Sequence, residues 1–387
     1  MKSGWETKSF EDCIEPVTYT QKIQRKDFLE DGDYPVISQE AEFINGYWDN
    51  AADVFKVDAP VVIFGDHTKI LKFVDFDFVL GADGVKVLPP KSFLLPKFFF
   101  YQLQTANLES LGYARHYKLL KELTIAYPKL AEQRRIVGIL DEAFEGLATA
   151  KANAEQNLQN ARALFESHLQ AVFTQRGDGW VEKSVGELVA EGVLVKPFDG
   201  NHGEIHPRKA DYTDSGVPFI MACDLQDGSV DTENCTFISR KLADSLRVGF
   251  AKDGDVVISH KGTIGRSAIV RTADDYIMLT PQVTAYRVKD ASKLFNRFVR
   301  FYFMSPLFQR EMIAGAADGS TRAYIGITKQ LSLRFRFPPL SDQKRIAAKL
   351  DILDPETQRL ESLYQRKLAA LDELKKSLLH RAFSGQL

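Results

Sequence analysis

The residues best suited to metal chemistry lie in one short string, "NHGEIHP" at residues 201–207. His202, Glu204 and His206 are all metal-ligand types, and pairs of histidines with a carboxylate occur in many zinc sites. The helical zinc signature, however, places the glutamate directly after the first histidine on one continuous helix. In this string a glycine separates the two and a proline follows, so we expect a loop and no metal site.

Other catalytic signatures are also missing. The proline pairs in "VLPPK" and "RFPPL" lack the preceding Asn or Asp of amino-methyltransferases, no glycine-rich loop carries the P-loop lysine, and "GADG" is too short for a dinucleotide fingerprint. Asp66 and Lys69 resemble part of a nuclease centre, but such pairs occur in most chains. Cys13, Cys223 and Cys235 form no CxxC pair, which argues against a disulfide framework and a cysteine zinc site. The sequence thus disfavours an enzyme with its own active site.

Basic and hydroxyl residues beside glycines are better candidates, and the chemistry that they suit is contact with nucleic acid. The glycine in "SHKGTIG" (residues 259–265) suits close backbone approach to phosphate, and "GYARHY" and "GSTRAY" place an arginine in a glycine-led loop. Equally open is a reading in which each tyrosine is a core residue and each arginine pairs with a local acid. The candidate contacts are Lys69, Lys72, Arg115, His116, Tyr117, His260, Lys261, Thr263, Arg266, Thr321, Arg322 and Tyr324.

Charge is distributed unevenly along a chain whose net charge is only -2. Residues 236–340 contain 17 Lys and Arg against 8 Asp and Glu, whereas residues 1–60 contain 6 against 13. A basic third is a candidate nucleic-acid face, because phosphate contact depends on local potential. A solvated basic surface explains the same counts equally well.

Length and composition indicate a folded protein of two or three domains, with 387 residues and 44% hydrophobic content. No apolar run approaches the ~20 residues that cross a bilayer. The first residues, "MKSGWETKSF", lack the apolar stretch of a signal peptide. We therefore expect a cytoplasmic protein without a membrane partner.

The elements that position these residues occur twice. "PKLAEQRRI" at residues 128–136 returns as "PPLSDQKRI" at residues 338–346, and the likeness extends in both directions. "GW" recurs at Gly4 and Gly179, "YPVIS" matches "VPFIM", "APVVIFGDHTKI" matches "GDVVISHKGTIG", and "FYQL" at Phe100 is placed over "FYFM" at Phe301. The order predicts a globular domain at 1–130, a helical segment at 131–176, a second globular domain at 177–340 and a second helical segment at 341–387.

The helical segments carry apolar residues at steps of three and four, and their other faces are dense in charge. Such a narrow seam favours antiparallel pairing of the two segments in a coiled coil, although each could instead lie on its own domain. Asp354 followed by Pro355, and Gly146 near the matching point, predict a break in each segment. The residues expected in helix pairing or partner docking are Leu158, Leu164, Phe165, Leu169, Phe173, Leu360, Tyr364, Leu371, Leu374, Leu378 and Phe383.

Each globular half combines short β-rich runs such as "DVVIS", glycine turns and one aromatic-rich helix, at residues 96–108 and 295–304. This composition predicts a mixed α/β domain. The fold class is therefore α+β or mixed: two α/β domains joined by two long helical segments, with a pseudo-twofold internal repeat.

The whole chain resembles the specificity (S) subunits of type I restriction-modification systems. The resemblance rests on the doubled P-[KP]-L-x-[ED]-Q-[RK]-R-I string, the "GW" openings, the "PVI" and "PFI" strands, "SHKGTIG" and "GSTRAY"; "GYARHY" and "GDHTKI" are looser versions. It implies that each globular half is a target recognition domain that reads one half of an asymmetric, bipartite DNA site. The helical segments would set the spacing and dock two methyltransferase subunits.

The resemblance further implies that this chain is noncatalytic and holds no cofactor. S-adenosylmethionine would belong to the modification subunits, and ATP would be used by a separate motor subunit that also cleaves DNA. Mg would likewise be used by partner subunits. Two other classes stay open from the residues alone: a self-contained nuclease or methyltransferase, and a coiled-coil scaffold unrelated to DNA.

A tandem duplication with antiparallel helices gives one chain a pseudo-twofold axis that matches the symmetry of duplex DNA. Helices of roughly 28 residues would be ~42 Å long at 1.5 Å per residue. That length corresponds to about 12 base pairs. We therefore expect the helices to act as a ruler for the unread bases between the two half-sites.

Overall fold

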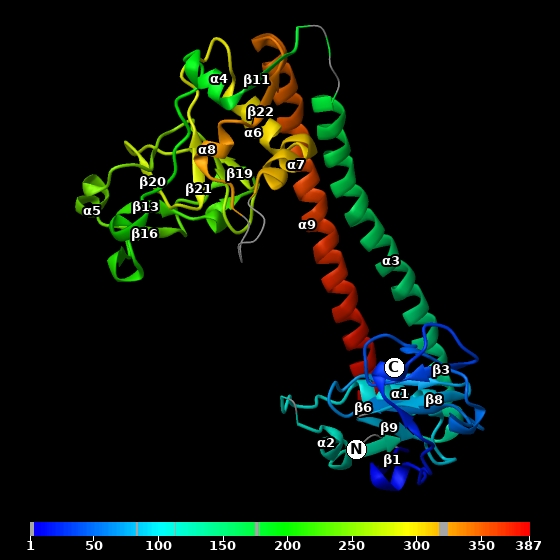
Figure 1. The fold of residues 1–387 in the computed structure, drawn as a ribbon. Helices are drawn as coiled ribbons and strands as arrows, with labels where there is room; N and C mark the ends of the chain where they lie inside the picture. Colours follow the sequence, from blue (N-terminus) through cyan, green and yellow to red (C-terminus); the bar gives the residue numbers. More distant parts are fainter. Residues whose placement is uncertain (1–3, 83, 113, 175–176, 178, 317–323) are drawn as a thin grey trace. The chain divides into compact units, whose positions relative to one another are not determined.

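The computed structural model describes residues 4–82, 84–112, 114–174, 177, 179–316 and 324–387, without the side chain of Glu204. The chain divides into two compact units. Unit 1 comprises Met1–Glu155 with Arg366–Leu387, and unit 2 comprises Gln156–Gln365. Each unit therefore holds one globular part and a stretch of both long helices (Figure 1).

The described part of unit 1 contains three small sheets. A two-stranded sheet pairs β1 with β10, a second has the order β2-β8-β3-β4 with β5 on β8, and the third has the order β7-β6-β9. The elements of the globular part are β1 (Glu6–Ser9), η1 (Glu11–Cys13), β2 (Lys22–Ile23), η2 (Arg25–Asp27), β3 (Tyr34–Ile37), β4 (Gly46–Trp48), η3 (Ala51–Asp53), β5 (Val54–Phe55), β6 (Val61–Gly65), β7 (Leu71–Val74), β8 (Phe78–Gly81), β9 (Val85–Leu88), α1 (Pro96–Gln104), α2 (Tyr117–Lys121) and β10 (Thr124–Tyr127).

The described part of unit 2 contains a two-stranded sheet, β11-β22, and two five-stranded sheets with the orders β12-β16-β13-β20-β17 and β14-β15-β19-β18-β21. Its elements are β11 (Val181–Ser184), α4 (Val185–Ala190), η4 (Gly203–Ile205), η5 (Lys209–Asp211), β12 (Tyr212–Thr213), β13 (Val217–Ile220), η6 (Ala222–Asp224), β14 (Leu225–Gln226), β15 (Ser229–Val230), β16 (Thr236–Ile238), α5 (Arg240–Ser245), β17 (Phe250–Ala251), β18 (Val256–Ser259), β19 (Ser267–Ile269), β20 (Ile277–Leu279), β21 (Val283–Tyr286), α6 (Asn296–Met304), α7 (Pro306–Gly315), α8 (Ile327–Gln330) and β22 (Arg334–Phe337).

The two units repeat the same strand pairing. β3 pairs with β8 in parallel, as β13 does with β20. β6 pairs antiparallel with β7 and β9, as β18 does with β19 and β21. The first and last strands of each globular part also pair, β1 with β10 and β11 with β22. The predicted internal repeat is therefore confirmed at the level of topology.

Helices α3 (Leu130–Thr174) and α9 (Leu340–Ser384) are each continuous over 45 residues. The predicted breaks are therefore wrong. Gly146 in a helix interior costs only about 1 kcal/mol relative to alanine, too little to end a packed helix. Pro355 lies inside α9, and the Asp354 carboxylate, instead of capping a new helix, accepts from Arg300 at 2.7 Å.

The repeated proline-containing strings position a buried glutamine at the start of each long helix. In unit 1 the Gln133 amide donates to the carbonyls of Phe93 and Pro128, both at 2.8 Å, and accepts from the Leu95 N–H at 2.8 Å. Gln343 makes the same three backbone bonds in unit 2, and both side chains are fully buried. We call these two residues the glutamine anchors; each fixes a long helix to its globular part.

The glutamine anchors also correct the alignment of the aromatic-rich helices. The N–H that bonds Gln133 belongs to Leu95, and the one that bonds Gln343 belongs to Phe295. The offset is thus 200 residues, as it is for α1 and α6. Phe100 is therefore equivalent to Arg300. The predicted alignment of Phe100 with Phe301 is wrong by one residue.

The long helices pack against each other in opposite directions (Figure 1). In unit 1, Leu140 of α3 shares a core with Leu379 of α9, and Lys151 pairs with Asp372 at 2.9 Å. In unit 2, Arg162 pairs with Glu361 at 2.8 Å, while the predicted Phe165, Leu169 and Phe173 share a core with Ala347 and Leu350. The prediction of an antiparallel pair is confirmed, and the helices pack on the globular parts as well.

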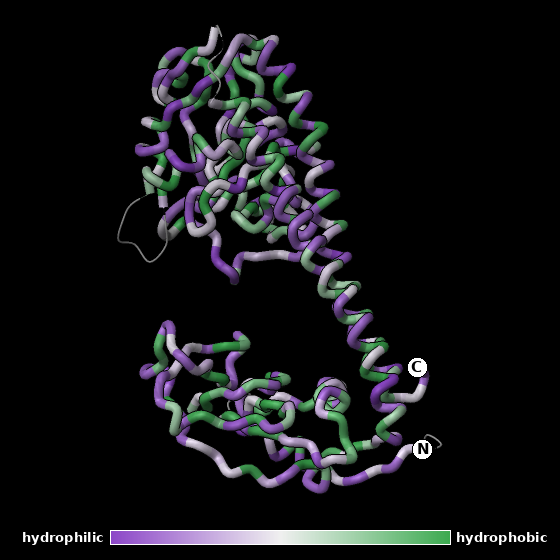
Figure 2. The backbone as a smooth tube through the Cα atoms, turned by 90° about the vertical axis from the view of Figure 1, so that its right-hand side faces the viewer, coloured by the Kyte–Doolittle hydropathy of each residue, from purple (hydrophilic) through white to green (hydrophobic). Residues whose placement is uncertain are grey.

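Small residues form part of the seam, since Ala154 and Ala161 are buried. Hydrophilic and hydrophobic residues interleave along the helical segments (Figure 2). Two residues predicted to pair or dock lie outside the seam: Leu164 is 64% exposed and Leu374 is 47% exposed. None of the described helices combines the length and apolarity that crossing a membrane requires.

Candidate nucleic-acid interface

Two candidate loops that are distant in sequence meet in unit 1. The β6–β7 loop begins at Asp66, and the second loop ends where α2 begins. The Asp66 carbonyl accepts from the His116 N–H, and its carboxylate accepts from the Tyr117 N–H, both at 2.7 Å. Asp66 of the "GDHTKI" motif and the last two residues of the "GYARHY" motif therefore lie together.

The matching loops also meet in unit 2. The β18–β19 loop begins at His260, whose carbonyl accepts from the Ile325 N–H at 3.1 Å, and Lys261 forms an isolated β-bridge with Tyr324. His260 is the structural equivalent of Asp66. The His260 N–H donates to the carbonyl of Gln282, just before β21, and the Asp66 N–H donates to the carbonyl of Gly84, just before β9. Thr321 and Arg322 lie outside the described residues.

His116 is a buried support for the unit 1 loops. Its Nδ1 lies 3.0 Å from the Asp66 carbonyl, which can only accept, and its Nε2 accepts from the Leu111 N–H at 3.0 Å. Both ring nitrogens are thus used inside the protein, and the geometry fixes the proton on Nδ1. That His116 binds DNA stays a prediction, and such contact requires the loop to open.

Tyr117 is partly buried and packs against the core of unit 1. Its ring centroid lies 6.1 Å from that of Phe10 and 6.4 Å from that of Phe64. Burial raises the pKa of its phenol. This arrangement favours the structural reading that the sequence left open for the tyrosines.

His260 is likewise buried, with no exposed surface. Its Nδ1 lies 2.8 Å from Thr284 Oγ1, and its Nε2 lies 3.6 Å from Asp199 Oδ2. Burial lowers the pKa of His260 to about 4, against an opposing effect of the Asp199 charge. The ring is therefore neutral at ordinary pH, and its centroid lies 5.5 Å from that of Tyr324.

The rest of the β18–β19 loop is open to solvent: Lys261, Thr263 and Arg266 are all exposed. Gly265 has a φ of +97°, and a Cβ there would lie 1.9 Å from the Gln309 amide oxygen. Only glycine fits that position without displacing Gln309, whose amide donates to the Gly265 carbonyl at 3.0 Å. The loop therefore has a defined shape that presents two basic side chains and one hydroxyl.

The remaining candidates in unit 1 differ in accessibility. Lys72 is 4% exposed and donates to Asn45 Oδ1 at 3.0 Å and to the Phe43 carbonyl at 3.3 Å. Burial lowers its pKa to about 8. Lys69 donates to the Leu108 carbonyl at 3.2 Å, whereas Arg115 is exposed. Arg115 is thus the unit 1 candidate that is free to approach a phosphate.

Residues 201–207 contain the three candidate metal-ligand residues considered above, and one of them, His202, interacts with a nearby carboxylate. His202 Nε2 lies 2.9 Å from Asp199 Oδ2. Within the described residues, no group of three or more His, Cys, Asp or Glu side chains is arranged to hold a metal ion. Sequence reasoning did not single out Asp199, because no motif marks it. Asp66 lies in the "GDHTKI" motif, but its connecting role could not be predicted, because the two loops meet only in the fold.

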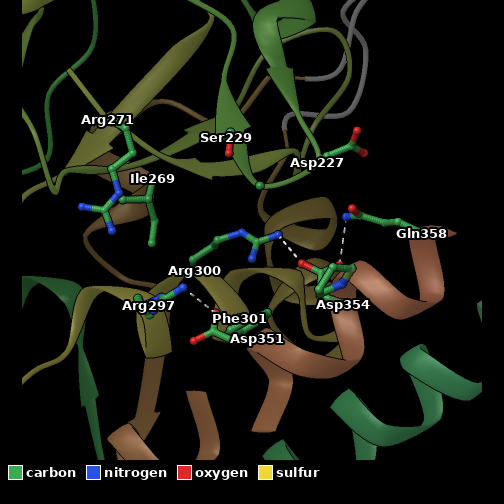
Figure 3. A pocket seen from close by; sticks show the side chains of 12 residues that line it. Asp227, Ser229, Ile269, Arg271, Arg297, Arg300, Phe301, Asp351, Asp354 and Gln358 are labelled. Carbon is green, nitrogen blue, oxygen red and sulfur yellow. Dashed lines mark hydrogen bonds and ion pairs between the residues drawn. The ribbon is translucent and has the colours of Figure 1, made fainter. Parts of the chain in front are cut away.

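A pocket of about 230 Å³ lies in unit 2, where α6 meets α9 (Figure 3). Arg300 pairs with Asp354 at 2.7 Å, and Arg297 pairs with Asp351 at 3.2 Å. Three arginines and three aspartates line the pocket, so its charges balance. This arrangement suits a structural joint between the helices better than an anion site. In unit 1 Lys97 and Asp141 form the corresponding pair at 2.9 Å.

Comparison with known proteins identifies the family. Residues 2–159 and 198–367 match the model described as "Type I restriction modification DNA specificity domain". The chain belongs to this family. The first matched segment covers the globular part of unit 1 and part of α3. The second covers most of the globular part of unit 2 and part of α9, while β11 and α4 lie before it.

Individual members of the specificity-domain family are distant in sequence. The specificity subunit of the type I restriction enzyme EcoBI from Escherichia coli is 22% identical over 287 residues, which cover 70% of this chain but only 60% of that relative. The EcoR124I/EcoR124II specificity subunit, also from Escherichia coli, is 25% identical over 355 residues, covering 87% of this chain and 83% of the relative.

A solved structure shares the fold over the full length. The chain in "Structural basis underlying complex assembly and conformational transition of the type I R-M system" is 18% identical, with a TM-score of 0.71. The match covers 100% of this chain and 99% of that one. The predicted fold class, two α/β domains with paired long helices and an internal repeat, is confirmed.

Proposed function

We propose that this chain is the noncatalytic DNA-specificity subunit of a type I restriction-modification complex. Each globular part would read one half of an asymmetric, bipartite DNA site. The observation that carries the proposal is the family match over both halves, together with a strand topology that repeats in two units whose loops differ. Two domains with the same strand topology but different loops are expected to recognise two different DNA sequences.

The exposed loop residues supply the chemistry of reading. Lys261, Thr263 and Arg266 in unit 2 and Arg115 in unit 1 are accessible, and arginine binds either phosphate or the O6 and N7 atoms of guanine. The basic character of residues 236–340 supports contact with a polyanion. The buried residues His116 and His260, and the partly buried Tyr117, would act beneath this surface by shaping the loops.

The long helices would set the number of unread bases and bind two methyltransferase subunits, and motor/endonuclease (R) subunits would join the assembly. Exposed apolar residues on the helices, such as Leu164, Ile352 and Leu374, support a docking role. S-adenosylmethionine, ATP and Mg would be used by those partners. Because the substrate is genomic DNA, the complex would work in the cytoplasm.

Methylome sequencing tests the proposal. The chain is expressed together with the methyltransferase subunits with which it copurifies, and the expected result is one methylated site made of two words separated by a fixed number of unread bases. Omitting the chain should abolish methylation at that site. Methylation that is unchanged without the chain would overturn the proposal.

The isolated chain distinguishes the other classes. Cleavage or methyl transfer by the purified chain would indicate a self-contained nuclease or methyltransferase. Binding to duplex DNA that is absent at every salt concentration, even with the partner subunits present, would indicate a scaffold.

A further inference from the structure

A buried chain of polar side chains runs beneath the β18–β19 loop of unit 2. The Tyr286 hydroxyl donates to Gln330 Oε1 at 2.7 Å, and Gln330 Nε2 lies 3.0 Å from Thr284 Oγ1. Thr284 Oγ1 lies 2.8 Å from His260 Nδ1. Each of these four residues is at most 1% exposed. Buried polar groups arranged in this way restrict a site to one geometry.

The direction of each hydrogen bond follows from its neighbours. Gln330 Nε2 also lies 2.9 Å from the Ile325 carbonyl, which can only accept, so the amide orientation is fixed. The Thr284 oxygen therefore accepts from Gln330, and its hydroxyl proton is left to donate to His260 Nδ1. The neutral His260 ring must then carry its proton on Nε2.

That Nε2 proton faces Asp199. The separation from Asp199 Oδ2 is 3.6 Å, beyond hydrogen-bond range. Among the described residues His260 Nε2 is a buried atom without a hydrogen-bond partner. The same Asp199 oxygen bonds His202 on its solvent side at 2.9 Å. The His260 ring is thus held firmly by Thr284 on one side and approached by a carboxylate on the other.

His260 in turn connects the two loops that carry the candidate DNA contacts. Its carbonyl accepts from the Ile325 N–H at 3.1 Å, and its N–H donates to the Gln282 carbonyl at 2.9 Å. The exposed residues Lys261 to Arg266 follow it directly. The His260 ring also contacts the second loop directly, since its centroid lies 5.5 Å from that of Tyr324, the residue that forms a β-bridge with Lys261. The position of the ring is therefore coupled to both loops.

Unit 1 fixes the equivalent position by different means. Asp66 stands where His260 stands, and its side chain accepts from the Tyr117 N–H at 2.7 Å. The described part of unit 1 therefore has no hydrogen bond equivalent to the one between Thr284 and His260, and a substitution of Thr284 should affect unit 2 alone.

We propose that Thr284 and Asp199 are positioning residues for the His260 ring, Thr284 through a hydrogen bond and Asp199 through its nearby charge, and that they thereby set the base selectivity of the β18–β19 loop. The proposal rests on the proposed function, because it assigns one of the two DNA words to this loop. Neither residue touches DNA; both act through His260.

The test uses the full chain assembled with its methyltransferase subunits and measures selectivity at each word by methylome sequencing. Thr284→Val keeps the shape but removes the hydroxyl, and Thr284→Ser restores the hydroxyl. We expect Thr284→Val to relax discrimination at one word about tenfold or more, as loss of a well-placed contact does, while the other word and the spacer stay unchanged. Thr284→Ser should restore wild-type selectivity.

Asp199→Asn is a second variant, which removes the negative charge near Nε2 on the other side of the His260 ring. It should relax the same word as Thr284→Val. Wild-type selectivity in both variants, equal loss at both words, or failure of Thr284→Ser to restore it would overturn this inference alone. A wild-type assembly that methylates no split site would overturn the proposed function and this inference with it.

Discussion

At the scale of residues, two histidines predicted to bind DNA lie buried at the loop junctions. His116 and His260 carry the same kind of motif signal as the exposed Lys261. The sequence predicts which motifs matter, because glycine-led loops with basic residues are recognisable. It could not predict burial, because His116 is covered by contacts with Asp66, 50 residues away.

The lowered pKa of His260 makes the stability of the chain depend on pH. The pKa falls from 6.5 to about 4, so between these values the unfolded chain binds a proton that the folded chain does not. The stability from a neutral His260 is present above pH 6.5 and is lost as the pH falls toward 4. Between about pH 7 and pH 4 the wild type should lose on the order of 2–3 kcal/mol more than His260→Gln. Urea unfolding at both pH values measures this difference; equal losses would contradict it.

Arg266 should contribute an electrostatic contact with DNA. Replacing one phosphate-binding cation reduces the magnitude of the slope of log K against log salt by about 0.9. Arg266→Ala should show that reduction in titrations of a labelled duplex. The control is Arg359→Ala, which removes an exposed arginine from α9, where it pairs with Glu356. An Arg266 slope equal to that of the wild type would show that the side chain binds no phosphate.

Removing one partner of the buried pair Arg300–Asp354 should lower the free energy of unfolding strongly, whereas replacing both partners with apolar residues should lower it only slightly. Asp354→Ala leaves a buried guanidinium unpaired, a change that typically costs about 3–5 kcal/mol. The double variant Arg300→Met with Asp354→Leu removes both charges and should cost much less. The equivalent residues in unit 1 are Phe100 and Phe144, so the fold shared by the two units accommodates apolar residues at these positions. Thermal unfolding of both variants checks the order, and a double variant less stable than Asp354→Ala would contradict it.

At the scale of elements, the sequence predicted the repeat, the aromatic-rich helices and the paired long helices. Periodicity and duplicated strings report such features directly. The continuity of α9 through Pro355 was not predictable, because it depends on Arg300, which lies on another helix and removes the Asp354 carboxylate from a capping role. The one-residue error in aligning α1 with α6 arose from similar aromatic strings at adjacent offsets.

The glutamine anchors should be essential for seating the long helices. Gln343→Leu leaves the Phe295 N–H and two carbonyls without their partner inside the protein, and each unsatisfied group costs about 1–3 kcal/mol. We expect a lower unfolding temperature than for Lys344→Ala, the control at the exposed neighbouring residue. Gln343→Leu and Lys344→Ala proteins with the same unfolding temperature would show that water replaces the anchor.

At the scale of the whole molecule, two globular parts share one topology but carry different loops. Resemblance to the S subunits predicted this organisation. Under the proposed function the DNA words stay unpredictable, because a loop motif indicates where contacts with DNA would lie but not which base each side chain would meet.

The length of the paired helices should set the spacer. Insertion of seven residues into both α3 and α9, at facing positions, keeps the helices paired and adds about 10 Å to each at 1.5 Å per residue. That distance corresponds to about three base pairs of duplex. Methylome sequencing should show a longer spacer and the same two words; altered words with an unchanged spacer would contradict the ruler role.

The chemistry of the glutamine anchors has a consequence for inheritance. Each glutamine bonds only main-chain N–H and C=O groups. Mutation of the globular part can therefore alter its side chains widely without weakening the joint, since every residue except proline offers those same groups. Recombination between related genes that exchanges one globular segment would give a chain whose helix is still seated. Under the proposed function, such an exchange would give a new combination of DNA words in a single genetic event.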